Sequence, residues 1–356
     1  MNDNELLDIY SDYLISAFGL TTATGLATLL GGAVSHDRIQ RFLANREFTS
    51  ADLWRIVKPH VRAVQRDDGV VIVDDSIAEK PYTDENDIVC WHYDHAQDRT
   101  IKGINFLTVM YHAHGVSLPV SFALIAKTEH YLDKAGKPKR RSPLSKNDYY
   151  QRLTQQAVTN QIPFTYVLND IWYASADNMM FVKHTLHKEF IMPLKANRKV
   201  AVSLADKRAG RFVRVDTLVL EPNTPQDIYL ESVDFPLRLV KQVFTNEDGN
   251  VGIQYLVTSD TTLSSDDITT LYQKRWNVEP YHKSLKQNAS LEKSPTQTVR
   301  TQTNHFFAAL CGYTKLELLK GSTKLNHFAL KSKLYVCALQ TAFAALQELQ
   351  PVRLAA

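Results

Sequence analysis

The sequence of 356 residues has the composition of a globular protein, with 44% hydrophobic residues, 22% charged residues and a net charge of +3. This mildly basic balance permits a nucleic-acid partner but does not by itself indicate one. The three cysteines, Cys90, Cys311 and Cys337, lie far apart and form no CxxC pair. That pattern argues against a disulfide framework and a structural zinc site, and is typical of a protein in a reducing cytoplasm.

An uncharged segment near the start of the chain, residues 14–35, is about as long as a membrane span. Glycines and threonines interrupt it, and acidic residues precede it where a signal peptide would carry positive charge. We therefore expect no membrane insertion, and predict a pair of buried helices with a glycine turn between them.

Residues 1–68 are predicted to form a helical N-terminal domain. Apolar residues recur at helical spacing over residues 5–18 and 22–30, Gly31 and Gly32 break the pattern, and Ser35 is the expected N-cap of the next helix. Two short helices across a glycine turn are typical of a helix-turn-helix DNA reader and also of a small helical bundle. Both interpretations stay open, with DNA-end binding as the function that the first would supply.

The pattern changes at Gly69, where short apolar runs begin. Runs at residues 70–73, 104–111 and 116–125 predict adjacent strands, and alternating helix and strand patterns follow. A mixed α/β sheet is therefore predicted for residues 69–196. Strand-like alternation over residues 197–262 predicts a β-rich insertion.

A long helix is predicted to start at Ser264 or Ser265, end near Lys286 and dominate residues 263–300, and helical patterns return over residues 301–356. One face of the long helix gathers charged and aromatic side chains. At about 100° per residue, five side chains fall within an arc of roughly 80°: Tyr272, Arg275, Glu279, His282 and Lys286. Trp276 and Lys283 lie at its edge. A carboxylate among cations suits a metal ligand beside a polyanionic backbone, although a solvated helix face gives the same pattern.

Four of these residues match, without a gap, the Y-(2)-R-(3)-E-(6)-K signature of the insertion-sequence transposases typified by insertion sequence four: Tyr272, Arg275, Glu279 and Lys286. The chain therefore resembles that family. In the family, the glutamate is the third member of a DDE triad, and the other signature residues grip the transposon end. The resemblance implies that Glu279 is a catalytic metal ligand and that six residues bind DNA: Tyr272, Arg275, Trp276, His282, Lys283 and Lys286. Trp276 would stack on a displaced base, or alternatively pack in the core.

A DDE triad needs two aspartates, and two strand ends supply candidates. Asp74 and Asp75 end the apolar run that starts at Val70, and Asp170 ends the run that starts at Tyr166. Because the family places its first aspartate directly before Thr or Ser, the resemblance favours Asp75, which precedes Ser76. Asp74 is then an additional metal ligand, a supporting hydrogen-bonding group or a turn former. The alternative role of Asp170 is a helix N-cap.

The resemblance implies an RNase H-like core, with the β-rich insertion between Asp170 and Glu279, a helical N-terminal domain and a helical C-terminal tail. It also implies two Mg²⁺ ions, which Mn²⁺ can replace, held by Asp75, Asp170 and Glu279. The implied function is a DNA transposase that cleaves double-stranded DNA at the terminal inverted repeats of a transposon and joins the freed 3′-hydroxyl to target DNA. A homodimer in the synaptic complex and a bacterial cytoplasmic location, on the nucleoid when acting, are further expectations.

Two other functions remain open. A catalytically inactive relative would bind DNA without cutting it, and a stand-alone metal-dependent nuclease of the same fold would cut DNA without joining it. The presence of all three acids disfavours the first. Two basic clusters could contact phosphates in any of these cases: Lys134, Lys137, Lys139, Arg140 and Arg141, and then Lys195, Arg198, Lys199, Lys207, Arg208, Arg211 and Arg214.

Overall fold

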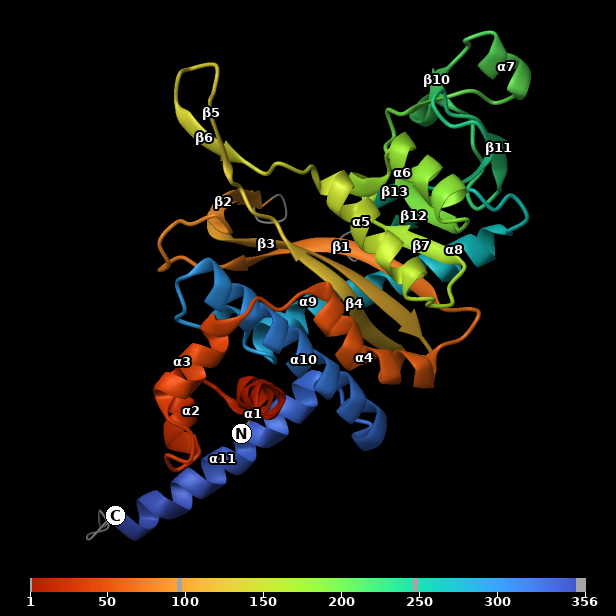
Figure 1. Cartoon of the computed structure of the whole chain (residues 1–356). Coiled ribbons are helices and arrows are strands. Elements are labelled where there is room, and N and C mark those ends of the chain that lie inside the picture. Colours follow the sequence, from red (N-terminus) through yellow and green to blue (C-terminus); the bar gives the residue numbers. More distant parts are fainter. Residues whose placement is uncertain (1, 95–97, 246–248, 350–356) are drawn as a thin grey trace. The chain divides into compact units, whose positions relative to one another are not determined.

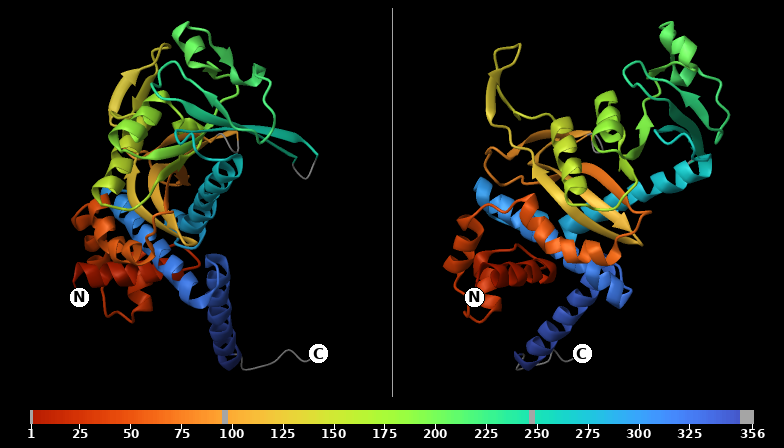
Figure 2. Two further views of the ribbon diagram at one scale, coloured as in Figure 1. Left: turned by 90° about the vertical axis from the view of Figure 1, so that its right-hand side faces the viewer. Right: turned by 45° about the vertical axis from the view of Figure 1, so that its right-hand side comes forward.

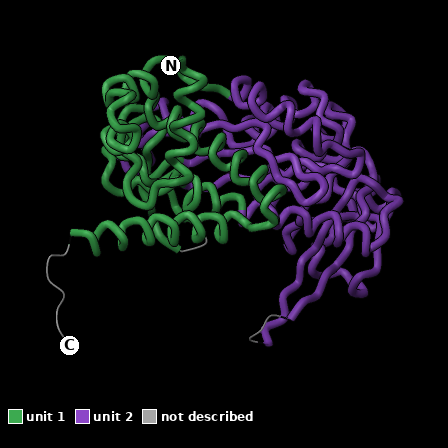
Figure 3. The backbone as a smooth tube through the Cα atoms, turned by 90° about the horizontal axis from the view of Figure 1, so that it is seen from below, with its two compact units in different colours: residues 1–49, 78–104, 281–356 green, residues 50–77, 105–280 purple. Residues whose placement is uncertain are grey.

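The computed structural model describes residues 2–94, 98–245 and 249–349. Its contacts divide the chain into two compact units (Figure 3). Unit 1 comprises Met1–Thr49, Ala78–Ile104 and Tyr281–Ala356, and unit 2 comprises Ser50–Ile77 and Asn105–Pro280. Within the described ranges, no helix is both long and apolar enough to cross a membrane. The last residues of the predicted C-terminal tail, 350–356, lie outside the described part.

Unit 2 is built on a mixed β-sheet, which confirms the predicted α/β class (Figure 1). Its strand order is β11-β12-β13-β8-β7-β1-β3, and β4 pairs with β3. Strands β1, β7 and β8 run parallel, while β11, β12 and β13 continue the sheet from β8 in antiparallel pairs. The strands are β1 (Val70–Glu79), β3 (Arg99–Ala113), β4 (Val116–Leu124), β7 (Tyr166–Asn169), β8 (Glu189–Leu194), β11 (Gln226–Ile228), β12 (Leu237–Thr245) and β13 (Val251–Thr258). The strands predicted between residues 197 and 262 thus include an extension of the central sheet.

Helices cover this sheet, and polar caps fix where they start. Helix α4 (Ser50–Val64) packs on β4, with the Ser50 hydroxyl bonded to both backbone groups of Phe122. Helix α5 (Lys146–Thr159) also packs on β4 and begins with a capping box of Ser145 and Asp148. The remaining helices here are α6 (Ala176–Met180), α7 (Leu204–Arg208) and α8 (Ser265–Gln273).

Two small hairpin-like sheets complete unit 2. Strands β9 (Lys199–Val200) and β10 (Val213–Arg214) pair near α7, and β5 (Glu129–Leu132) pairs with β6 (Pro138–Arg141). The β5–β6 hairpin projects from the main sheet just before α5 (Figures 1 and 2). It carries the first basic cluster of the sequence.

The helix predicted to run unbroken to Lys286 is interrupted, so that prediction is wrong in its middle. Helix α8 ends at Gln273, a 3-10 turn spans Lys274–Asn277, and α9 (Val278–Gln287) follows. Pro280 explains the break, because it has no backbone N–H and its ring is incompatible with a helical carbonyl at Trp276. The Ser264 cap predicted for the start is present.

Unit 1 is a helical bundle around α10 (Val299–Thr323), whose middle is buried almost completely. Helices α1 (Asp3–Ser16) and α3 (His36–Asn45) pack on α10, and Ser35 caps α3 as predicted. Helix α2 (Ala23–Leu29) buries only Leu26, so the expected pair of buried helices is wrong for its second member. The arrangement of α1 and α3 on α10 is that of a bundle. Strand β2 (Val89–Asp94), paired with residues 99–104 of β3, and helix α11 (His327–Leu349) complete the unit.

Candidate active site

The first two acids of the site lie where the pairing of parallel strands β1 and β7 stops. The last pair is Val73 with Asn169, so Asp74 and Asp75 are the next residues of β1, which continues to Glu79, and Asp170 follows the last residue of β7. Successive side chains of a strand point to opposite faces of the sheet, so Asp74 and Asp75 lie on opposite faces of β1. The charge of Asp170 acts on Asp74, and that of Asp75 acts on Asp170, so the three carboxyls are close together.

The carboxylate of Asp75 is fully engaged by protein groups. Tyr173 donates its hydroxyl proton to Oδ1 over 2.6 Å, while the Lys146 ammonium and the Asn105 amide donate to Oδ2 over 2.7 and 3.0 Å. Burial alone would raise the pKa of Asp75, but the Lys146 charge and these three hydrogen bonds hold it below its ordinary value. Asp75 is therefore an ionised carboxylate with a permanent counter-charge.

Asp74 has a different environment. Its Oδ1 accepts the backbone N–H of Asp75 over 2.9 Å, and its Oδ2 lies 4.0 Å from the Arg275 guanidinium. Burial, together with the charges of Asp170 and Asp75, raises the pKa of Asp74 to about 8. The Arg275 charge thus does not offset burial and the two neighbouring acids at Asp74.

Asp170 performs the capping role considered for it, because its Oδ1 accepts the Trp172 N–H over 2.9 Å. Burial nevertheless raises the pKa of Asp170, and the charge of Asp75 adds to that rise, while the Trp172 hydrogen bond opposes it. Capping and metal binding do not exclude each other, since a carboxylate has two oxygens that together accept about four hydrogen bonds.

Arg275 connects these aspartates to the third acid. Its guanidinium lies 4.0 Å from Asp74 and 3.8 Å from Glu279, distances too long for hydrogen bonds. The arginine side chain is only 12% exposed, whereas that of Glu279 is 59% exposed. The guanidinium also lies over the rings of Trp276 and Tyr272, at 4.6 and 5.6 Å from their centres. Its Nε atom is buried without a hydrogen-bond partner in the described part of the chain.

These acids fit a divalent cation in donor chemistry and in charge. Carboxylate oxygens are the ligands that Mg²⁺ and Mn²⁺ prefer, and Asp74 and Asp170 keep raised pKa values although the Arg275 charge acts on both. Within the described ranges, no three His, Cys, Asp or Glu side chains are already drawn together as a metal cluster. Of the acids considered, Glu279 has the most exposed side chain, and its position is the least constrained by neighbouring groups.

The predicted DNA-binding residues divide between the two units. Tyr272, Arg275 and Trp276 belong to unit 2, and the buried Tyr272 hydroxyl donates to the Asn169 carbonyl over 3.4 Å. The other three, His282, Lys283 and Lys286, belong to unit 1. The 3-10 turn and the burial of Tyr272 mean that the single exposed face expected from the helical spacing is not formed.

Within unit 1, the Lys286 ammonium lies 3.9 Å from Glu292, and the Lys283 ammonium lies 5.2 Å from the centre of the Phe328 ring. The His282 ring lies 5.1 Å from the Tyr281 ring. These contacts give both lysines a local partner on the bundle itself.

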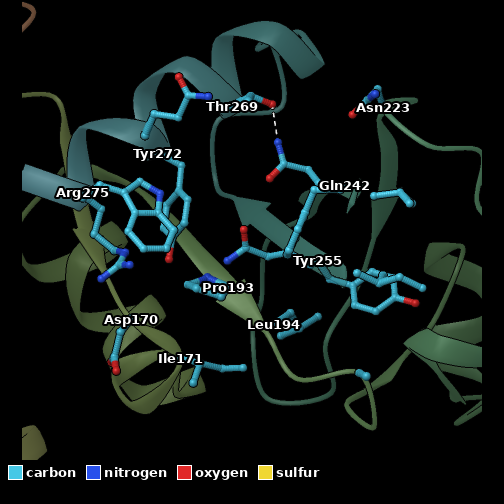
Figure 4. A pocket seen from close by; sticks show the side chains of 17 residues that line it. Asp170, Ile171, Pro193, Leu194, Asn223, Gln242, Tyr255, Thr269, Tyr272 and Arg275 are labelled. Carbon is cyan, nitrogen blue, oxygen red and sulfur yellow. Dashed lines mark hydrogen bonds between the residues drawn. The ribbon is translucent and has the colours of Figure 1, made fainter. Parts of the chain in front are cut away.

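A cavity of about 710 Å³ opens beside the acids. Figure 4 shows Asp170 and Arg275 at one end, Asn223 and Tyr255 at the other, and the Gln242 amide bonded to the Thr269 hydroxyl between them. Trp276, whose indole is 50% exposed, also lines this cavity. The Trp276 side chain is therefore half-exposed at the site rather than a core residue.

Three residues that complete the site had not been identified from the sequence: Lys146, Tyr173 and Asn105. They come from the start of α5, the turn after β7 and strand β3, and no motif links them to Asp75. One signal was present, since the alternation of a strand already separates the side chains of Asp74 and Asp75 onto opposite faces.

Comparisons with known proteins agree with this chemistry. A family model described as DDE superfamily endonuclease matches residues 2–211, and one described as transposase DDE domain matches residues 145–315. A search among curated proteins returns no match. Among solved structures, the Drosophila P element transposase strand transfer complex is similar over 57% of this chain and 46% of that chain, with 9% identity and a TM-score of 0.29. The matched part is thus less than half of that protein.

The first family model covers more than half of the sequence and includes both aspartate strands. The second includes Asp170 and the whole stretch from Tyr272 to Lys286. The family as a whole generally works with divalent metals, which the carboxylates of this site suit. The chain therefore belongs to the DDE superfamily of endonucleases.

Proposed function

We propose that the chain is a transposase of the insertion-sequence-four type, with an RNase H-like core, that cleaves transposon ends and joins the 3′-hydroxyl to target DNA. The observation that carries the proposal is the position of Asp74 and Asp170, each directly after the last paired residues of parallel strands β1 and β7, with Arg275 between Asp74 and Glu279. Residues 69–196 and 263–300 would form the core, with 197–262 as its insertion. Terminal inverted repeats, target DNA, a homodimeric synaptic complex and the bacterial nucleoid belong to the same proposal.

The catalytic triad proposed is Asp74, Asp170 and Glu279, with Asp74 in place of the Asp75 that the sequence favours. Asp75 has its oxygens engaged by Lys146, Tyr173 and Asn105, and lies on the opposite face of β1 from Asp74. A carboxylate already paired with a cation in this way is a poor ligand for a second one. Asp75 would instead be a positioning residue, which fixes this part of β1 and hence the neighbouring Asp74.

The triad would hold two Mg²⁺ ions, for which Mn²⁺ can substitute. When bound, the metals activate the attacking water or hydroxyl and neutralise charge on the phosphate. Arg275 would then be free to donate to a phosphate oxygen, since its present contacts with the acids exceed hydrogen-bonding distance. Trp276 offers a half-exposed indole on which a base can stack. Tyr272 would position Arg275, and His282, Lys283 and Lys286 would contact the DNA backbone.

The β5–β6 hairpin would add a sequence-independent DNA contact. Lys139 is paired with Asp133 at 3.2 Å, whereas Lys134 and Lys137 have no carboxylate within salt-bridge distance among the described residues. We expect the double substitution Lys134→Gln and Lys137→Gln to make the slope of log K against log salt shallower by about 1 to 2, because each lost phosphate contact removes about one released counterion. A filter-binding series on duplex DNA between low and physiological salt measures it.

The matched control for the hairpin is Lys139→Gln, which removes a lysine of the same hairpin that already has an acidic partner. It should change the slope by less than about half of the double variant's effect. An unchanged slope in the double variant would rule out the hairpin as a DNA contact and leave the active-site assignment intact.

The decisive test of function supplies purified protein with the candidate terminal repeats and Mg²⁺ or Mn²⁺. We expect the wild type to produce cut ends and joined products. Glu279→Gln should lower the cleavage rate by more than about 100-fold, which is a larger loss than the removal of a group that only supports a metal ligand causes. The control is Glu221→Gln, an exposed glutamate of the insertion. Protein that cuts DNA without joining it would be a nuclease, and protein that binds DNA without cutting it would be an inactive relative. Cleavage that survives Glu279→Gln would exclude this residue from the triad.

A further inference from the structure

The 3-10 turn Ile171–Tyr173 holds an exposed tryptophan directly after one acid of the site. Both sides of this tryptophan are tied to the acids. Asp170 accepts the Trp172 N–H over 2.9 Å, and the buried Tyr173 donates its hydroxyl proton to Asp75 over 2.6 Å. The Trp172 side chain itself is 61% exposed. Because two residues of chain span at most about 7 Å, the indole is held close to Asp170 without being part of the core.

A lysine from the neighbouring strand lies over this indole. Lys195 follows the last residue of β8, just as Asp170 follows the last residue of β7, and these two strands pair in parallel within unit 2. The Lys195 ammonium lies 5.6 Å from the centre of the Trp172 ring, which is within the range of a cation–π contact. Trp172 and Lys195 are here called the tryptophan–lysine platform. It combines an exposed aromatic surface with a positive charge.

The segment that supplies this lysine is cationic. Residues 195–199 include Lys195, Arg198 and Lys199 and no acid. Among the described residues, none of these three cations has a carboxylate within salt-bridge distance, whereas two arginines later in the same basic cluster are each paired with an aspartate. The charge next to the indole is therefore available to an anion from solution.

The platform is separate from the aromatic surface already assigned to DNA. Trp276 and Ile171 line the cavity beside the acids, and Trp172 is not among the described residues that line it. Asp170 thus has an exposed indole near it on two sides, one that lines the cavity and one that does not. A nucleotide on Trp276 would leave the platform open to another nucleotide.

A nucleic-acid strand matches the platform, because each of its units joins an aromatic base to an anionic phosphate. A base can stack on an aromatic side chain where its own face is uncovered, as in an unpaired stretch or at the end of a duplex. Successive nucleotides of a duplex strand are about 3.4 Å apart along the axis, so the indole is within a few nucleotides of any phosphate at Asp170.

We propose that the tryptophan–lysine platform stacks on an uncovered base of the DNA strand that lies across Asp170, with the Lys195 ammonium contacting a phosphate of that strand. The inference rests on the proposed function, since it requires DNA at the acids. Trp172 and Lys195 would thereby hold the strand on the outer side of the cavity while Arg275 and Trp276 hold it on the inner side.

Equilibrium binding of the full-length protein to DNA of arbitrary sequence in EDTA tests the platform. One duplex carries 2-aminopurine in a short unpaired 3′ overhang, a second carries it in the last base pair of a blunt end, and a closed circular duplex offers no uncovered base. The wild type should quench the fluorescence of at least one linear duplex. The duplex that is quenched identifies the base as unpaired or terminal.

Trp172→Ala should abolish this quenching and weaken binding of the quenched duplex by about 5- to 100-fold, because one stacked base is lost. Binding of the circular duplex should change by less than about 2-fold. Trp172→Phe should recover most of the affinity, since an aromatic ring remains. Lys195→Gln should make the slope of log K against log salt shallower by about 1, because one phosphate contact is lost. The indole is exposed, so the variants should keep the fold, and circular dichroism verifies this.

The matched control is Trp91→Ala on strand β2. Trp91 is 52% exposed, and the Lys102 ammonium lies 5.9 Å from the centre of its ring, so it forms the same kind of pair. Its indole N–H, however, donates to the Glu85 carboxylate over 2.8 Å, and that negative charge repels phosphate. Trp91→Ala should therefore quench and bind all three DNAs as the wild type does.

Two results would overturn the platform and leave the proposed function intact. One is a Trp172→Ala variant that quenches and binds as the wild type does. The other is an equal loss of affinity for linear and circular DNA, which would show that the substitution acts through the turn at Asp170 and not through stacking. A wild type that binds none of the three DNAs would contradict the platform and the proposed function together.

Discussion

Asp74→Asn should remove more than about 100-fold of the DNA cleavage rate, while Asp75→Asn should cost between about 10-fold and 100-fold. The reason is the difference in their partners. Asp74 lies 4.0 Å from Arg275 and keeps a raised pKa, whereas the carboxylate of Asp75 is held by Lys146, Tyr173 and Asn105. Loss of a metal ligand is expected to abolish metal binding, whereas loss of a group that positions a ligand is expected only to weaken metal binding.

The measurement is single-turnover cleavage across a range of Mn²⁺ concentrations. For Asp75→Asn, part of the lost rate should return as the metal is raised, because its ligands remain present but poorly positioned. For Asp74→Asn, added metal should restore little. The reverse ranking of the two variants would return the first ligand to Asp75, as the residue before Ser76 had suggested.

The same two substitutions should shift thermal stability in opposite directions when no metal is present. In the unfolded chain Asp74 loses its proton near pH 4, and in the folded protein near pH 8. Between these values the folded state binds more protons than the unfolded state, so stability falls as the pH rises through this window. Asp74→Asn removes that penalty, and at pH 8.5 it should raise the free energy of unfolding by on the order of 3 kcal/mol, or the Tm by about 5 to 10 °C.

Asp75 has the opposite sign, because its pKa is lowered in the folded state. Its stabilising effect is present above the unfolded pKa and is lost as the pH falls through the folded value, so Asp75→Asn should lower the Tm at neutral pH. Loss of charged hydrogen bonds of this kind costs about 1 to 3 kcal/mol. Calorimetry in EDTA at pH 4 and pH 8.5 gives both signs, with Asp68→Asn as an exposed control. A Tm that falls by the same amount in both variants would refute the assigned environments.

The strands were predictable because their signals are local. Four consecutive buried residues, from Val70 to Val73, mark a central parallel strand. The prediction that this strand ends at the acids is wrong, because β1 continues to Glu79, whereas Asp170 does follow the last residue of β7. The mixed sheet follows from such patterns. The interrupted helix was missed, although Pro280 is visible in the sequence, because the apolar spacing of a 3-10 turn and of an α-helix differ little over one turn.

The partners of Asp75 could not be predicted, because they are far from it in the sequence. Asn105, Lys146 and Tyr173 follow Asp75 by 30, 71 and 98 positions. Contacts over such distances depend on how helix α5 and strand β3 pack on the sheet, and spacing in the sequence does not encode that packing. The evidence for Asp74 over Asp75 therefore comes from these contacts, whereas the residue before Ser76 had favoured Asp75. The match of Glu279 to a gap-free signature needed no such information, which is why it could be made from the sequence alone.

The pleat of β1 also determines which positive charge each of its two aspartates meets. The Lys146 ammonium donates to Asp75 over 2.7 Å, so that carboxylate has a tightly paired charge that belongs to the protein. Asp74 lies on the opposite face of the strand, where the Arg275 guanidinium at 4.0 Å is too far away for a hydrogen bond. A one-residue step along a strand thus gives one carboxylate a tightly bound counterion and its neighbour a loosely bound one.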